Sequence, residues 1–334
     1  MGPMGGPESL ESSLRKLCDV NVDRLESLYS IGNVIGEGRF SKVYQGVKVE
    51  GGNTVALKEL DLGALEEDEE ALEMLEAEVV ALRRASQGGA AHVVRLHQVI
   101  AAHDAVWLAL ERVPGRELFE LVEERGPLPN VLVCSLMKQL LTALEALAGL
   151  GVVHRDVKPE NMMVSEDEAG AQLTLIDFGY AAIIGVDGGS PTLTGVAGSP
   201  EYAAPEVLSW LEVEADETGN AVGEPYDAGC DVWSVGVTAH VLLCAELPFE
   251  LPEDCTEESL VAAARTVELT FRRPEWDGEG MAAARDFVKC CMSTDRHQRP
   301  SARALLEHEW VSPGGVKGGN GVNGAFVEVT AAPE

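Results

Sequence analysis

The sequence lacks the features that would place the protein in a membrane or mark it for secretion. No run reaches the roughly 18 uncharged apolar residues that a membrane-spanning helix needs. The opening residues, MGPMGGPESLESS, contain no basic region followed by an apolar core. The glycine at position 2 does not predict myristoylation, because position 6 is also glycine rather than serine or threonine. We therefore expect a soluble protein of the cytoplasm, the nucleus or both, with no membrane partner.

Basic residues are also scarce. The 334 residues contain 25 Lys and Arg against 56 Asp and Glu, which gives a formal net charge of −31. This charge argues against nucleic acids and anionic membranes as main partners, and it is compatible with basic proteins or peptides. Solubility alone explains it equally well. The seven cysteines form no CxxC pair, so the sequence predicts reduced thiols and no zinc site.

The chain changes character near residue 113. Before that point, strand-like runs surround one amphipathic segment, ALEEDEEALEMLEAEVVALRRAS, in which apolar residues recur every three or four positions. After it, the segments are mainly helical, and VLVCSLMKQLLTALEALAGLG is apolar nearly all round, which predicts burial. We predict a bilobal α+β fold, with a β-rich lobe at 29–113 and a helical lobe at 114–311. A loose extension at 1–28 and a disordered Gly-rich tail at 312–334 complete the chain.

The stretch IGEGRFSKV is the first candidate site. Gly36 and Gly38 follow strand-like residues, and another strand is predicted after them. Glycines let a hairpin backbone fold closely over phosphates, with its amide groups as donors. Taken alone, the motif is a weak signal and is most often just a tight hairpin. A dinucleotide-binding dehydrogenase is excluded, because its glycines open a helix rather than a strand.

Lys58 follows apolar residues in VALKEL, which predicts a partly buried lysine that needs an anionic partner. Glu78 in the amphipathic segment is one candidate, and a nucleotide phosphate is another. Taken alone, Lys58 would more often be an exposed strand lysine.

Two further segments, HRDVKPEN and LIDFG, bring charged groups next to apolar runs. Asp156 could act as a base towards a hydroxyl, and Lys158 could neutralise a phosphate. The carbonyl oxygen of Asn161 suits Mg²⁺, and the carboxylate of Asp177, at the end of an apolar strand, would be a second hard ligand. A solvated turn explains either segment alone, but not both in this order.

The glycine loop, the lysine of VALK, HRDVKPEN, DFG and APE together resemble the ordered motifs of eukaryotic protein kinases, over about residues 30–311. The resemblance implies the kinase fold and an ATP- and Mg²⁺-dependent transfer of the γ-phosphoryl group to a protein hydroxyl. Lys158 and GSPEY resemble serine/threonine kinases. A pseudokinase scaffold is the alternative, and it is disfavoured because the expected catalytic residues are all present.

The resemblance also implies the role of each site residue. The catalytic set would be Asp156, which accepts or orients the hydroxyl proton, with Lys158, Lys58 and Ser199. Ser199 would bond Asp156 and Lys158, and Asn161 and Asp177 would hold Mg²⁺. Glu78 is the predicted partner of Lys58, with Glu76 as runner-up. The implied ATP-binding set is Ile35, Gly36, Glu37, Gly38, Val43, Ala56, Lys58, Glu78, Leu110, Glu111, Val113, Glu117 and Glu160.

Other residues match structural positions of the family. Glu206 is expected to pair with Arg299, and Asp231 to anchor the backbone of the catalytic loop. The family's stacked regulatory column, which is core rather than site, is matched by Leu82, Leu96, His154 and Phe178.

Stretches such as GRELFELV and RPSARALLEHEWV resemble the calcium/calmodulin-dependent group, including plant-type calcium-dependent kinases. In that group, acids matching Glu117 and Glu160 read an Arg three residues before the target, so we expect a preference for basic substrates. Only 24 residues follow Trp310, and an EF-hand loop alone takes about 12. No calmodulin-binding helix is visible either, so no direct calcium control is expected.

The activation segment, from Asp177 to Glu206, leaves its own control open. It contains Ser190, Thr192 and Thr194, and glycine occupies position 195, where many relatives carry a phosphorylated threonine. Arg155 could receive a phosphate from this segment, or the segment could be ordered without phosphate. Arg116 stands where the family has a second glycine, and the stretch 211–225 is acidic. Either feature could alter substrate docking or be neutral. We expect a monomer.

Overall fold

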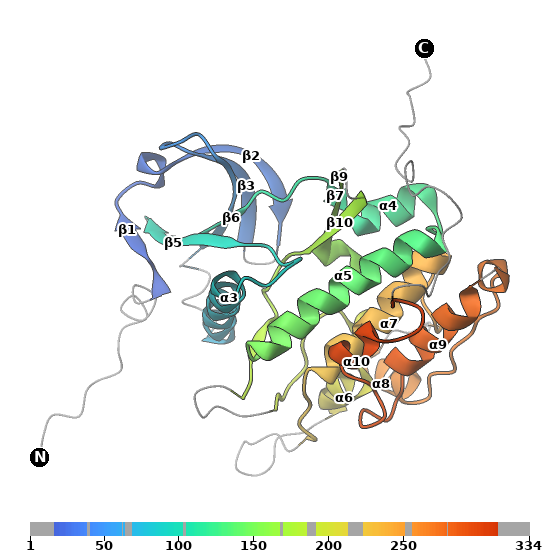
Figure 1. The fold of residues 1–334 in the computed structure, drawn as a ribbon. Helices are drawn as coiled ribbons and strands as arrows, with labels where there is room; N and C mark the ends of the chain where they lie inside the picture. Colours follow the sequence, from blue (N-terminus) through green and yellow to red (C-terminus); the bar gives the residue numbers. More distant parts are fainter. Residues whose placement is uncertain are drawn as a thin grey trace, which may run out of the picture. The chain divides into compact units, whose positions relative to one another are not determined.

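The structure is a computed structural model with two compact units. Unit 1 contains Met1–Gly89 and Val94–Val113, and unit 2 contains Ala90–Val93 and Pro114–Glu334. Each unit is described by itself, with its elements labelled in Figure 1. The structure describes residues 17–38, 41–61, 63, 69–102, 105–167, 170–185, 192–212, 223–250, 256–278 and 280–312.

Unit 1 is built on a six-stranded sheet of order β1-β5-β6-β4-β3-β2. Strands β2 to β6 pair antiparallel, whereas β1 runs parallel to β5 at one edge. Helix α3 (Glu69–Gln87) buries its apolar stripe of Leu75, Val79 and Leu82, as the three- and four-residue spacing predicts. The strands are β1 (Val20–Val22), β2 (Tyr29–Glu37), β3 (Ser41–Lys48), β4 (Thr54–Asp61), β5 (Leu96–Ala102) and β6 (Ala105–Glu111).

The segment 17–28 is not the loose extension that its composition predicts. Its strand β1 pairs with β5 in the register Val20↔Ile100. The 3-10 turn Leu25–Ser27 that follows buries the Leu25 side chain in the core of the unit, beside Tyr29. The burial of Leu25 and the backbone pairing of β1 offset the conformational entropy of ordering this segment. Residues 1–16 lie outside the described part of the chain.

Unit 2 is mainly helical, with two small sheets. The helices are α4 (Leu118–Arg125), α5 (Asn130–Gly149), α6 (Pro205–Leu208), α7 (Gly229–Cys244), α8 (Glu257–Arg265), α9 (Met281–Cys291) and α10 (Ala302–Leu306). The sheets have the orders β10-β9-β7 and β11-β8. Their strands are β7 (Arg116–Glu117), β8 (Val152–Val153), β9 (Met162–Asp167), β10 (Gly170–Leu175) and β11 (Ala182–Ile183).

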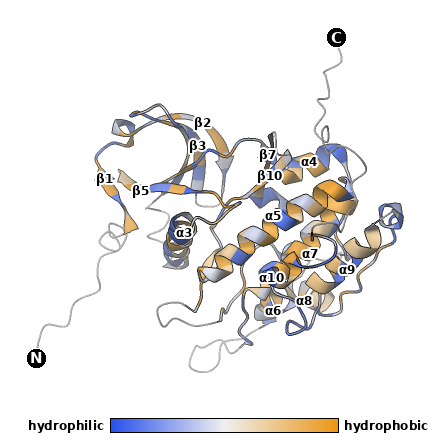
Figure 2. Cartoon of the chain, in the orientation of Figure 1, coloured by the Kyte–Doolittle hydropathy of each residue, from blue (hydrophilic) through white to orange (hydrophobic). Residues whose placement is uncertain are grey.

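The core of unit 2 forms around α5 and α7, both of which are largely hydrophobic in Figure 2. Every residue of α7 from Cys230 to Cys244 is buried, which is expected of a helix that is apolar on all sides. Helix α5 is long and apolar enough to cross a membrane by length and composition alone. Half of its most apolar window is nevertheless buried inside the protein, which is typical of a core helix.

The predicted division into a β-rich lobe and a helical lobe is therefore confirmed. The predicted amphipathic helix is also confirmed from Glu69 onwards. The tail predicted to be disordered lies, from residue 313 onwards, outside the described residues, as does 213–222 within the acidic stretch.

Candidate active site

Lys58 and Glu78 form a buried ion pair in unit 1. Lys58 lies in the middle of β4, opposite Val43 on β3 and Leu108 on β6, and only 8% of the residue is exposed. Its Nζ atom donates to Oε1 of Glu78 on α3 at 2.6 Å, and Glu78 is 3% exposed. Glu76, the alternative partner, is only partly buried. The predicted pairing with Glu78 is thus present, and it satisfies the need of a buried charge for a partner.

The glycine stretch joins two strands, as predicted. Gly36 pairs with Val43 across β2 and β3, and Glu37 pairs with Lys42. The amide of Gly38 donates to the Ser41 carbonyl at 2.8 Å, which closes the hairpin. Residues 39 and 40 at its tip lie outside the described residues. Ile35, just before the glycines, is 40% exposed, so an apolar surface is available for a ligand.

Four residues of the implied ATP-binding set lie on two neighbouring strands and the segment that follows them. Ala56 on β4 is the cross-strand partner of Leu110 on β6, and both are partly buried. Glu111 ends β6, and Val113 is buried at 7% exposure. The backbone of this segment follows directly from the sheet of unit 1.

In unit 2, Asp231 anchors the loop after β8. Both of its carboxylate oxygens accept backbone hydrogen bonds at 2.8 Å, from the amides of His154 and Arg155. Asp231 lies in the first turn of α7 and is 4% exposed. Burial raises its pKa, while the two amides and the neighbouring His154 and Arg155 oppose that rise. The predicted anchoring role is confirmed by these bonds.

Four predicted catalytic and metal-binding residues form one hydrogen-bonded network in unit 2. Asp156, 5% exposed, accepts from the Ser199 amide through Oδ1 and from Asn161 Nδ2 through Oδ2, both at 2.8 Å. The Nζ atom of Lys158 lies 3.1 Å from Asp156 Oδ2 and donates to Ser199 Oγ at 2.6 Å. The network fixes the orientation of the Asp156 carboxylate, as a general base for a hydroxyl group needs, and it places the Lys158 ammonium group beside that carboxylate.

Gly198 makes this network possible. It has a φ of +81°, and a Cβ atom there would lie 2.1 Å from the carbonyl oxygen of Arg155. Any other residue would force the backbone before Ser199 away from the loop that holds Asp156. The sequence GSP therefore has a steric reason for its glycine.

Asn161 and Asp177 offer oxygen ligands that suit a hard cation. Asn161 Nδ2 gives both of its hydrogen bonds to Asp156, so its Oδ1 oxygen takes no part in them. The amide of Ile176 donates to the Asn161 carbonyl at 2.9 Å, which ties the residue before Asp177 to the same loop. Asp177 is exposed and has a φ of +54°. An amide oxygen and a carboxylate on tethered backbones fit the preference of Mg²⁺ for oxygen donors.

The family's regulatory column is core, as predicted. His154 and Phe178 are both fully buried, and their rings contact edge to face with centroids 4.8 Å apart. The Asp156 amide donates to Nδ1 of His154, so Nε2 bears the proton and bonds the Ile176 carbonyl at 3.2 Å. In unit 1, Leu82 and Leu96 are buried.

Arg155 is engaged by groups that the sequence analysis missed. Its Nε atom donates to the Tyr180 carbonyl at 2.7 Å, and its Nη1 atom donates to the Tyr226 hydroxyl at 3.4 Å. The same hydroxyl donates to the Gly195 carbonyl at 3.0 Å, and the backbones of Tyr226 and Leu193 exchange two hydrogen bonds. Tyr226 thus holds the activation segment beside Arg155. Ser190 lies outside the described residues.

Glu117 and Glu160 form an acidic pair in unit 2. Burial, followed by the carboxylates of Glu120 and Glu160, raises the pKa of Glu117. The Oε2 atom of Glu160 is buried without a hydrogen-bond partner among the residues that the structure describes. Both residues are half-buried, and removing carboxylates from water without a neutralising partner is costly, so this pair has the chemistry to bind a cationic group.

Arg299 and Glu206 form the predicted structural ion pair of unit 2. Their side chains are 0% and 11% exposed, and the guanidinium reaches both carboxylate oxygens, at 2.5 and 3.1 Å. Arg299 also donates to the carbonyls of Gly229 and Ser293. The pair therefore connects α6 with the start of α7 and the segment after α9.

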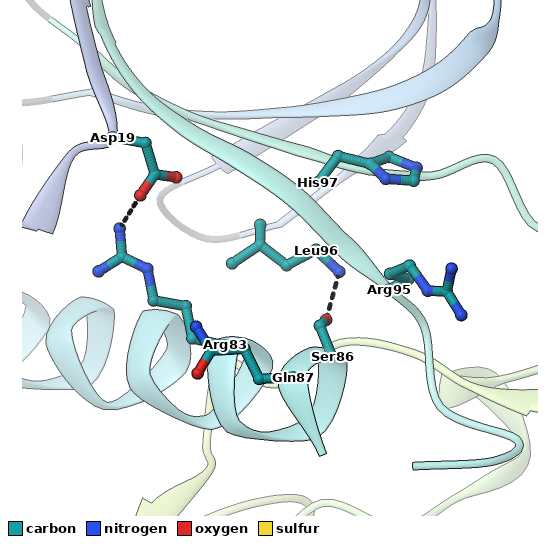
Figure 3. Close-up of a pocket in the computed structure, with 7 residues that line it drawn as sticks. All are labelled: Asp19, Arg83, Ser86, Gln87, Arg95, Leu96 and His97. Carbon is teal, nitrogen blue, oxygen red and sulfur yellow. Dashed lines mark hydrogen bonds and ion pairs between the residues drawn. The ribbon is translucent and has the colours of Figure 1, made fainter. Parts of the chain in front are cut away.

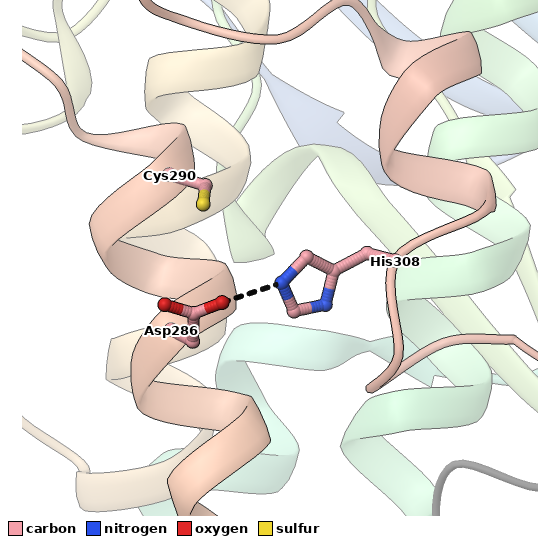
Figure 4. A group of neighbouring side chains, drawn as sticks. All are labelled: Asp286, Cys290 and His308. Carbon is pink, nitrogen blue, oxygen red and sulfur yellow. Dashed lines mark hydrogen bonds and ion pairs between the residues drawn. The ribbon is translucent and has the colours of Figure 1, made fainter.

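A second cluster of potential ligands, Asp286, Cys290 and His308, lies elsewhere in unit 2 (Figure 4). His308 Nδ1 accepts the Trp310 amide, so its Nε2 bears the proton and faces Asp286 at 3.2 Å. A metal at Nε2 would move that proton to Nδ1, against the amide of Trp310. The hydrogen bonds therefore favour a structural Asp–His contact over a metal site.

Comparison with known proteins identifies the family. The protein kinase domain model matches residues 29–311. A calcium/calmodulin-dependent protein kinase type 1 of Macrobrachium nipponense is 32% identical over 303 residues, 90% of this chain and 80% of the relative. A probable myosin light chain kinase of Dictyostelium discoideum is 30% identical over 290 residues, covering 86% and 68%. The CBL-interacting protein kinase 30 of Oryza sativa subsp. japonica is 34% identical over 284 residues, covering 84% and 54%.

Proposed function

The chain belongs to the protein kinase family and is a serine/threonine protein kinase, and we propose that it transfers the γ-phosphoryl group of Mg-ATP to Ser or Thr hydroxyls in basic sequence contexts. The observation that most supports this proposal is the network of Asp156, Lys158, Asn161 and Ser199. A scaffold without catalysis would not need a buried carboxylate oriented by three separate donors.

Asp156 serves as the group that orients the substrate hydroxyl and takes its proton. Its carboxylate is held by the Ser199 amide and by Asn161, so it loses little entropy when a hydroxyl approaches. Lys158 lies beside it and contributes positive charge where the transferred group becomes negative.

The ammonium group of Lys58 binds the α- and β-phosphates of ATP, and the ion pair with Glu78 keeps that group in position. The hairpin of Gly36 and Gly38 supplies backbone amides for the phosphates. Asn161 and Asp177 would hold Mg²⁺, which would neutralise phosphate charge. The adenine and ribose contacts come from the remaining predicted residues, Ile35, Glu37, Val43, Ala56, Leu110, Glu111, Val113 and Glu117.

Glu117 and Glu160 select substrates with an arginine near the target. The raised pKa of Glu117 and the unpartnered oxygen of Glu160 support this part of the proposal. A guanidinium group can satisfy two carboxylates at once through its planar set of donors. Arginine is therefore expected to be preferred over lysine.

The experiment is a positional-scanning peptide phosphorylation assay with Mg-ATP, on the wild type, Asp156→Asn and the exposed control Asp277→Asn. We expect transfer by the wild type and the control, with a preference for Arg three residues before the target. Asp156→Asn should lose a factor of about 10² to 10⁴ while it still binds ATP. A wild type that binds ATP but phosphorylates no peptide would instead indicate a pseudokinase.

A further inference from the structure

The strand that precedes the kinase domain is bound to both the sheet and the helix of unit 1. Residues 17–22 lie outside the 29–311 match to the family model. Within them, Asp19 forms two hydrogen bonds with Val99 on β5. The Asp19 amide donates to the Val99 carbonyl, and the Val99 amide donates to Asp19 Oδ2, both at 2.8 Å. Strand β1 then continues along β5 from Val20 to Val22.

The second carboxylate oxygen of Asp19 reaches the helix. Arg83 on α3 donates to Asp19 Oδ1 at 2.6 Å and to the Leu17 carbonyl. Figure 3 shows the Arg83 guanidinium directed towards Asp19 from α3. One carboxylate therefore bridges the edge strand of the sheet and the helix, with 44% of its own side chain and 28% of Arg83 exposed.

The bridged helix is the one that holds the ion pair of the site. Glu78 precedes Arg83 by five residues, which is about 7.5 Å along the helix axis and about 140° around it. The Lys58 contact and the Asp19 contact thus restrain different sides of α3. Ser86 Oγ adds a third restraint near the end of the helix, where it accepts from the Leu96 amide at 2.8 Å.

We infer that Asp19 and Arg83 are positioning residues for phosphotransfer, and that the strand at 17–22 sets the rotation of α3 so that Glu78 meets Lys58. This inference rests on the proposed function of Lys58. Without the bridge, the helix can turn about its axis and leave Lys58 without its partner for part of the time. The population with a competent phosphate site then falls, and the apparent affinity for ATP falls with it.

The test uses the full chain and five variants in addition to the wild type. Arg83→Ala removes the helix side of the bridge, and Asp19→Asn removes the charge while it keeps an oxygen for the Val99 amide. The double variant tests whether the two act together, and Arg83→Lys keeps the charge. Arg95→Ala is the matched control, because Arg95 is exposed in the same region but directed away from Asp19 (Figure 3). The readouts are deuterium uptake over 69–87 and the KM for ATP against kcat.

We expect Arg83→Ala and Asp19→Asn to increase deuterium uptake over 69–87 and to raise the KM for ATP about twofold to fivefold, the range of a partly exposed ion pair. The double variant should be no worse than the singles, Arg83→Lys should recover part of the loss, and Arg95→Ala should match the wild type. The inference would be overturned if both single variants had the deuterium uptake and the KM for ATP of the wild type. It would also be overturned if the effects of the two substitutions simply added in the double variant. If the wild type proved inactive, only the proposed function would be contradicted. Deuterium uptake over 69–87 would still show whether the Asp19–Arg83 contact restrains α3, because that measurement does not depend on catalysis.

Discussion

The Nζ atom of Lys58 lies 2.6 Å from Oε1 of Glu78, and the two side chains are only 10% and 4% exposed. Removing one charge from such a pair leaves the other buried without compensation. We predict that Lys58→Met lowers the free energy of unfolding by about 3–5 kcal/mol. Phosphotransfer should fall by a factor of about 10³, because a preorganised positive charge at the phosphates is lost. Urea unfolding and a peptide phosphorylation assay measure the two effects.

The double variant Lys58→Met/Glu78→Gln separates stability from chemistry. A neutral pair of similar volume avoids the uncompensated charge, so most of the stability should return. Activity should remain as low as in the single variant. Recovery of phosphotransfer by the double variant would show that Lys58 has no catalytic charge to contribute.

The sequence predicts contacts well where both partners belong to recognisable motifs. Lys58 and Glu78 are only 20 residues apart. The residues alone leave Glu78 and a nucleotide phosphate as alternative partners of a buried lysine, and the family resemblance selects Glu78. Arg299 and Glu206 are 93 residues apart, and only the family resemblance predicts their pairing.

Contacts outside those motifs could not be predicted. Asp19 bonds Val99 from 80 positions away, and the three strand residues Val20–Val22 are too few to give a periodic signal. Tyr226 lies 71 positions from Arg155 and follows the acidic stretch, where composition indicates a loop. Both contacts depend on the chain being folded, since tertiary pairing rather than local propensity stabilises them.

Arg299 illustrates a structural ion pair with no catalytic role. Its side chain is fully buried against Glu206 and makes two further bonds to backbone carbonyls. Arg299→Met should lower the free energy of unfolding by about 3–5 kcal/mol, because Glu206 and the carbonyls lose their donor. The surviving folded protein should keep its KM for ATP.

Arg303→Met is the matched control for that prediction. Arg303 is 85% exposed and lies 3.9 Å from Glu145, so its loss should change stability by about 0.5 kcal/mol or less. Urea unfolding of both variants gives the comparison. Equal effects of the two substitutions would contradict the structural role of Arg299.

Tyr226 suggests that the activation segment is ordered without phosphate. Its hydroxyl accepts a hydrogen bond from Arg155 and donates one to the Gly195 carbonyl. The Arg155 guanidinium also donates to the Tyr180 carbonyl, so it already has oxygen partners without a phosphate. Tyr226→Phe should lower kcat about fivefold, the equivalent of one hydrogen bond of ~1 kcal/mol. Tyr29→Phe, which loses a hydroxyl bond to Gln98 in unit 1, is the control and should keep kcat. Phosphatase treatment should leave the wild type active, and loss of activity on that treatment would show that phosphate orders the segment.

We expect ionised Glu117 to lower the free energy of unfolding while it contributes to the binding of a substrate arginine. Its pKa is raised by burial and by the carboxylates of Glu120 and Glu160. The folded protein therefore binds this proton more tightly than the unfolded chain, and the ionised form opposes folding above the raised pKa. Glu117→Gln should increase the free energy of unfolding at pH 7, and the increase should disappear as the pH falls below the ordinary glutamate pKa of about 4.3. Urea unfolding at a series of pH values measures this.

The same substitution should reduce recognition of arginine. For peptides with Arg three residues before the target, kcat/KM should fall about tenfold, the equivalent of ~1.4 kcal/mol for a lost charge-assisted contact. Peptides without that arginine should keep their kcat/KM. The control Glu123→Gln, an exposed position on α4, which begins directly after Glu117, should keep the kcat/KM of both kinds of peptide. In the wild type, the preference for arginine should weaken as the pH falls through the raised pKa, because a protonated Glu117 no longer attracts a guanidinium. An equal loss for both kinds of peptide would assign Glu117 to ATP rather than to the substrate, since a ribose contact serves every peptide alike.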